Sequence, residues 1–231
     1  SFSRDFEREA DRLGFQTLTG AGYDVRGMGD FFGRLQLAGR VYENNAPVYL
    51  RSHPLTVERI SDMQNRAQGA PYRQVADSLD FQLVRAKLRA QIGTPQEAAS
   101  EFGKQLQEKK YGSEVATRYG LAYALFKAKQ LAAAQREVEA LAALKASSPM
   151  IAGLAAAIRM AADDPPGAVA IYRDAMQRYP QSRSLVYGYA EALLAARQYG
   201  DGLRFLDSQL QTYSSDYKLY GLQARTFAAS G

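Results

Sequence analysis

The feature that most constrains the fold is an interval of 34 residues that recurs through the C-terminal two thirds of the chain. Two antiparallel helices need small residues where their backbones approach and a larger residue in the adjoining gap, and such pairs bury their apolar faces only by stacking. Three columns keep the interval: Ala122, Ala156, Ala190 and Ala224; Ala134, Ala168 and Gly202; and Val138, Tyr172 and Leu206. The spacing predicts an all-α stack of helix pairs.

The predicted pairs occupy residues 78–110, 113–147, 149–180 and 183–214, and a final helix follows at 216–230. The first pair joins the series with a 36-residue step, through Ala86, Ala98 and Phe102. Helix–turn–helix units of this length resemble the tetratricopeptide repeat. The pattern departs from that family because the chain has no tryptophan and because Arg159 stands at a usually apolar position. The alternative is an alanine-rich helical bundle without true repeats.

The N-terminal third has a different organisation. Helical periodicity and capping residues predict helices over 3–20, 25–41 and 57–67. The run Val48–Leu50 between the last two is a candidate edge strand, and residues 68–71 read as a linker. We therefore expect two domains, residues 1–70 and 71–231.

Composition excludes several kinds of chemistry. The chain of 231 residues has no cysteine and one histidine, His53, so it holds no thiolate site and no His-Glu-x-x-His zinc motif. No apolar run reaches the roughly 18 residues that a transmembrane helix needs. The net charge of +5 is spread along the chain, which argues against nucleic-acid binding.

Two carboxylates mark the first predicted helix. Glu7 and Asp11 are one helical turn apart and share a face. One such carboxylate can ligate a metal while its neighbour orients another ligand. The simpler interpretation is a solvated helix face.

The residues around Glu7 and Asp11 favour the metal-binding interpretation. Glu7, Ala10 and Asp11 form a Glu-x-x-Ala-Asp motif that resembles the third-ligand motif of metallopeptidase family 48, of the BepA/HtpX type. The similarity extends over further residues: Ser3, Arg4, Gly14, Gly20–Asp24, Phe31, Phe32, Leu35, Ser52–Leu55 and Glu58–Ile60.

This resemblance implies a parent zinc metalloendopeptidase whose two histidine ligands and catalytic glutamate lie on an upstream helix. Glu7 would be the third zinc ligand, and Asp11 would orient a ligating histidine. His53 is either a surface loop residue or a regulatory ligand that enters the open zinc position and holds the protease inactive. The Val48–Leu50 run could pair with substrate.

The chain lacks the upstream helix, so we expect it to be inactive and to bind no zinc alone. It begins without methionine or a signal peptide, which indicates a processed or excised piece. The resemblance implies a periplasmic location and a role in outer-membrane protein quality control. The alternative is a non-catalytic repeat scaffold; a His-Glu-x-x-His motif upstream in the gene would separate the two hypotheses.

The repeats predict a surface for polypeptide. In tetratricopeptide repeats the first helix of each pair lines a concave groove, which here places Tyr119, Tyr123, Phe126 and Tyr187 along it. Rigid aromatic rings suit peptide binding. We expect protein or peptide clients, with outer-membrane assembly machinery among the candidates; alternatively, the rings pack between helices.

Overall fold

A computed structural model describes residues 4–40 and 56–231, and all regular structure in these ranges is α-helical. The predicted all-α fold with helical repeats is confirmed. The chain divides into two compact units, Ser1–Ala76 and Asp77–Gly231. The candidate strand Val48–Leu50 and the helix-capping Ser3 lie outside the described residues.

The first unit contains helices α1 (Arg4–Gly20), α2 (Arg26–Arg40) and α4 (Val57–Ala67). Asp24 Oδ1 accepts the backbone N–H of Arg26 at the start of α2, at 3.0 Å. Helices α2 and α4 pack together and bury Phe32 and Met63. Helix α1 also contacts α4, and this contact forms the candidate site described below.

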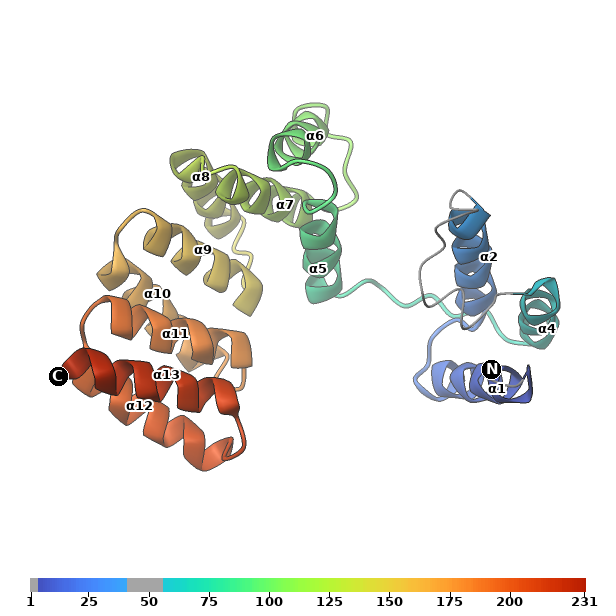
Figure 1. The fold of residues 1–231 in the computed structure, drawn as a ribbon. Coiled ribbons are helices and arrows are strands. Elements are labelled where there is room, and N and C mark those ends of the chain that lie inside the picture. Colours follow the sequence, from blue (N-terminus) through green and yellow to red (C-terminus); the bar gives the residue numbers. More distant parts are fainter. Residues whose placement is uncertain (1–3, 41–55) are drawn as a thin grey trace. The chain divides into compact units, whose positions relative to one another are not determined.

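The second unit is a succession of antiparallel helix pairs that ends in a single helix (Figure 1). Its helices are α5 (Leu79–Arg89), α6 (Pro95–Gln107), α7 (Glu114–Lys127), α8 (Leu131–Ala143), α9 (Pro149–Ala161), α10 (Pro165–Arg178), α11 (Arg183–Ala195), α12 (Tyr199–Thr212) and α13 (Tyr217–Ser230). Each lies inside a predicted range. Many begin as their sequences indicate: Thr94 and Glu97 form a capping box at α6, and prolines occupy the first turn of α6, α9 and α10.

The columns of the 34-residue interval form the contacts between helices. Ala122, Ala156 and Ala190 are at most 1% exposed, whereas Ala224 is exposed because α13 contacts its neighbours α11 and α12 with its other face. Small residues also face large ones. A Cβ on Gly120 would lie 2.5 Å from the buried ring of Phe102, and Gly188 faces the Tyr172 ring in the same way.

The turns inside the later pairs repeat as well. Lys129, Asp163 and Arg197, again 34 residues apart, adopt left-handed conformations with φ between 57° and 62°. The residue after each donates its N–H back into the preceding helix, as Gln130 does to the Leu125 carbonyl at 2.9 Å. In the first pair, Gly93 has a φ of 71°.

No helix in the described ranges, 4–40 and 56–231, combines the length and the apolar character that a bilayer crossing requires.

We expect Gly120→Ala to destabilise the repeat unit by about 1–3 kcal/mol, because the buried Phe102 ring has little room to move. Gly221→Ala is the matched control: it lies in a helix with nothing within 4 Å of the added Cβ. That control should gain up to about 1 kcal/mol of helix propensity. Urea unfolding followed by circular dichroism measures both, and equal effects would contradict the close packing.

Candidate functional site

One arginine of α4 joins the two carboxylates of α1. Arg59 Nε donates to Asp11 Oδ2 at 2.7 Å, and Nη2 donates to Asp11 Oδ1 at 2.8 Å. The remaining nitrogen, Nη1, lies 2.9 Å from Glu7 Oε2. The guanidinium therefore binds Asp11 as a two-pronged fork and Glu7 through its third nitrogen, which are the strong charge-assisted geometries of arginine.

The cluster of Glu7, Asp11 and Arg59 is shielded from water. Their side chains are 13%, 6% and 11% exposed respectively. The Phe32 ring lies 5.4 Å from the Arg59 guanidinium carbon, in cation–π distance. Removing one member of such a buried ionic set is strongly unfavourable, because the other members lose its compensating charge.

Local sequence explains how the cluster forms. Glu7 and Asp11 share one face of α1, as their spacing predicted, and this face contacts Arg59 of α4. Thr56 Oγ1 accepts the Arg59 N–H and fixes the start of α4, so Arg59 lies in the first helical turn. The helix dipole disfavours a cation there, and the two carboxylates offset this.

Sequence reasoning noted Arg59 only as part of a resemblance and gave it no role. Its position in the sequence was the feature that could have identified this role. An arginine directly after a helix cap needs acidic partners, and the helix with two carboxylates on one face was the available source.

The cluster borders a hollow of about 630 Å³ between α1 and α4, which Thr56 and Asn65 also line. An exposed ion pair, Arg8 to Glu58 at 2.5 Å, joins the same two helices outside it. Screening makes such exposed pairs weak. The buried cluster is therefore the main polar link between α1 and α4 among the described residues.

The cluster has two carboxylates for one guanidinium. Carboxylate oxygen is an accepted zinc ligand, and a neighbouring carboxylate suits a ligating imidazole. Within residues 4–40 and 56–231, no three metal-binding side chains come together. His53 lies outside the described residues.

The aromatic residues expected to line a groove are less available than predicted. Tyr119 is 2% exposed and belongs to the core between helix pairs, so its ring cannot serve a peptide; burial also raises the pKa of its hydroxyl. Tyr123 and Phe126 are half-buried against the same core. Periodicity identified the helix face but could not show how deep each ring lies.

Tyr187 belongs to a polar network between α11 and α13. Its hydroxyl donates to Asp216 Oδ2 at 2.7 Å and accepts from Arg183 Nη2 at 2.8 Å. Asp216 also caps α13 by accepting the N–H groups of Lys218 and Leu219, and the Tyr187 hydrogen bond helps to lower its pKa. The Tyr187 ring is thus fixed in place while staying partly exposed.

The two units match different protein-family models. Residues 1–67 match the model of peptidase family M48, and residues 159–226 match a model of the tetratricopeptide repeat. The first match contains the whole Glu7–Asp11–Arg59 cluster.

One similar protein matches the chain over its full length, and others match a part of it. The beta-barrel assembly-enhancing protease of Yersinia pestis is 27% identical over all of this chain, which covers 48% of that relative. A putative beta-barrel assembly-enhancing protease of Vibrio cholerae is 39% identical over 44% of this chain and 21% of its own length. The Escherichia coli protein of the same name is 38% identical over 38% of the chain and 18% of its own. The chain spans about half the length of the Yersinia relative and less of the other two. It thus contains a segment that matches family M48 and a segment that matches the tetratricopeptide repeat.

Proposed function

We propose that this chain is the part of a zinc-dependent metalloendopeptidase that supplies one metal ligand and the repeat domain. The observation that carries the proposal is the buried Glu7–Asp11–Arg59 cluster inside the segment that matches family M48. By the names of its relatives, we place the protein in outer-membrane protein quality control in the periplasm, as a proposal. A non-catalytic scaffold is the alternative, in which the cluster would serve only to join α1 to α4.

In this proposal Glu7 is the third zinc ligand. Its carboxylate lies on a rigid helix and is held by Arg59 at 2.9 Å. Zinc, when bound, lowers the pKa of a bound water and polarises a peptide carbonyl. The described residues supply carboxylate oxygen and no imidazole, so two histidines would have to come from elsewhere in the protein, and the chain alone is expected to be inactive and metal-free.

Asp11 and Arg59 then act as positioning residues. Each Asp11 oxygen accepts one Arg59 N–H, and a carboxylate oxygen can accept a second hydrogen bond. Asp11 can therefore hold a ligating imidazole while remaining fixed to α4. Arg59 keeps both carboxylates aligned, and the Phe32 ring lies against the guanidinium.

The repeat unit would bind protein clients or partners, including components of outer-membrane assembly. Tyr123, Phe126 and Tyr187 retain partly exposed rings for this purpose. Fixed aromatic rings contribute contact area at low entropic cost.

Glu7→Gln in the full-length protein should bind zinc at least tenfold more weakly, because an amide is a poor zinc ligand. Glu9→Gln is the control, since Glu9 is exposed and pairs with Arg12 on another face of α1. Zinc content after dialysis against a competing chelator, with peptidase activity in parallel, measures both. Wild-type zinc retention by Glu7→Gln would refute the ligand assignment.

Arg59→Gln should destabilise the contact between α1 and α4 by about 3–5 kcal/mol, because it removes the buried guanidinium that the two carboxylates share. Arg66→Gln removes an exposed pair with Asp62 in the same helix and should cost less than about 0.5 kcal/mol. Hydrogen–deuterium exchange of peptides from α1 and α4 reports the change locally. Unaltered exchange in Arg59→Gln would show that the cluster does not hold the two helices together.

His53→Ala in the full-length protein should increase proteolysis, if the imidazole occupies the open metal position. Cleavage of an unfolded protein substrate at matched zinc content gives the rate. An unchanged rate would remove His53 from the regulation of the site.

A further inference from the structure

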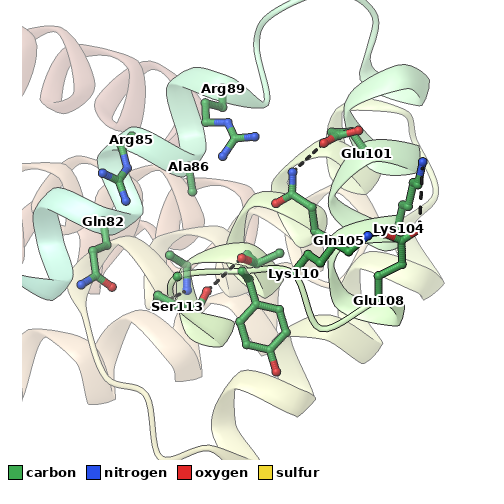
Figure 2. A pocket seen from close by; sticks show the side chains of 14 residues that line it. Gln82, Arg85, Ala86, Arg89, Glu101, Lys104, Gln105, Glu108, Lys110 and Ser113 are labelled. Carbon is green, nitrogen blue, oxygen red and sulfur yellow. Dashed lines mark hydrogen bonds and ion pairs between the residues drawn. The ribbon is translucent and has the colours of Figure 1, made fainter.

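A second site lies in the first helix pair of the repeat unit, outside the aromatic positions discussed above. It is a pocket of about 440 Å³ between α5, the end of α6 and the start of α7. Four cations line it, Arg85, Arg89, Lys104 and Lys110, and we call it the basic pocket. Figure 2 shows Arg85 and Arg89 projecting from α5 on one wall, with Lys104, Gln105 and Lys110 on the other.

The pocket has more positive charge than its own carboxylates neutralise. Glu108 is shared by Lys110 at 2.9 Å and Lys104 at 4.0 Å, and Glu101 accepts a hydrogen bond from Gln105. In the described parts of the chain, no carboxylate lies in ion-pair distance of Arg89, which instead stacks 5.5 Å from the Phe102 ring centre. Arg85 forms a long, exposed pair with Asp77, at 3.5 Å, and its guanidinium carbon lies 5.3 Å from the Phe81 ring centre.

The backbone adds to the positive electrostatic potential of the pocket. Gly112 and Ser113 line the pocket at the start of α7, a helix of 14 residues whose positive dipole end is there. The segment 77–130, which contains every residue that lines the pocket, holds nine Lys and Arg against six Asp and Glu. This segment therefore carries three of the chain's five surplus positive charges.

Geometry indicates what kind of anion would fit. Arg85 and Arg89 are four residues apart on one face of α5, so their stems are separated by about 6 Å. In an extended peptide, side chains two residues apart are separated by about 6.6 Å and point the same way. Two guanidinium forks at this spacing match two carboxylates at alternate positions of an extended chain.

We propose that the basic pocket binds an acidic segment of a partner polypeptide, with Asp or Glu at alternate positions. Arg85 and Arg89 bind the two carboxylates, and Glu101 and Glu108 accept hydrogen bonds from peptide N–H groups. These two glutamates disfavour a nucleic acid, whose phosphates repeat without interruption. The inference deepens the proposed binding of protein partners by the repeats and rests on that proposal.

The test uses fluorescence anisotropy of the 231-residue chain with a labelled ten-residue peptide that carries glutamate at alternate positions. The same peptide with glutamine in place of glutamate is the ligand control. We expect the glutamate peptide to bind at least about tenfold more tightly at low salt, and to lose this advantage as salt screens the charges.

Arg85→Gln with Arg89→Gln should reduce binding of the glutamate peptide about tenfold or more. Arg136→Gln with Arg225→Gln removes the same charge from exposed positions on α8 and α13 and should change it less than about threefold. Circular dichroism melting checks that both variants fold. If the double variant does not fold, Arg85→Gln alone replaces it, because this change leaves the Arg89–Phe102 stacking intact. The single variant should also weaken binding.

Three outcomes would overturn the inference. Equal binding of both peptides would reject the charge recognition while leaving polypeptide binding by the repeats in place. An equal loss in the two double variants would reject the pocket as the site. Tighter binding of a single-stranded oligonucleotide, abolished by the Arg85 and Arg89 changes, would assign the pocket to nucleic acid.

Discussion

The close approach of helix backbones at small residues is the constraint on which the repeat unit depends. Where Gly120 and Gly188 stand, aromatic rings of Phe102 and Tyr172 fill the space that a side chain would need. In the repeat between them, the equivalent positions hold Leu154 and Val138, so a larger residue replaces the glycine where a smaller residue replaces the ring. Dense interior packing requires such paired changes.

In the first unit, an ionic interaction rather than close backbone packing joins two of the helices. Its α1 has one buried residue, and that residue is Asp11 rather than a hydrophobic one. Apolar packing therefore contributes little to the α1–α4 contact, and an ionic cluster specifies how the two helices meet. A buried ionic contact has stricter geometric requirements than an apolar one, which suits a place where a carboxylate must be presented in one orientation.

Periodicity was sufficient for most of the architecture. The interval of 34 residues and the capping residues placed α5–α13, because both are local consequences of helix geometry. The shared face of Glu7 and Asp11 followed from the same rule. Arg59 did not, because its partners are 48 and 52 residues away and pairing over such distances leaves no periodic trace. Burial depth also escaped prediction: Tyr119 and Tyr123 are four residues apart on one helix, yet only one is in the core.

The turns inside the helix pairs have a consequence for the evolution of the array. Lys129, Asp163 and Arg197 hold a left-handed backbone that glycine adopts without strain, as Gly93 does in the first pair. Each costs about 1–2 kcal/mol relative to an unstrained residue, a sizeable share of a domain's net stability. Glycine at these three surface turns would therefore raise the stability of the repeat unit without changing the core. That added stability would let the chain tolerate destabilising new side chains on its binding faces.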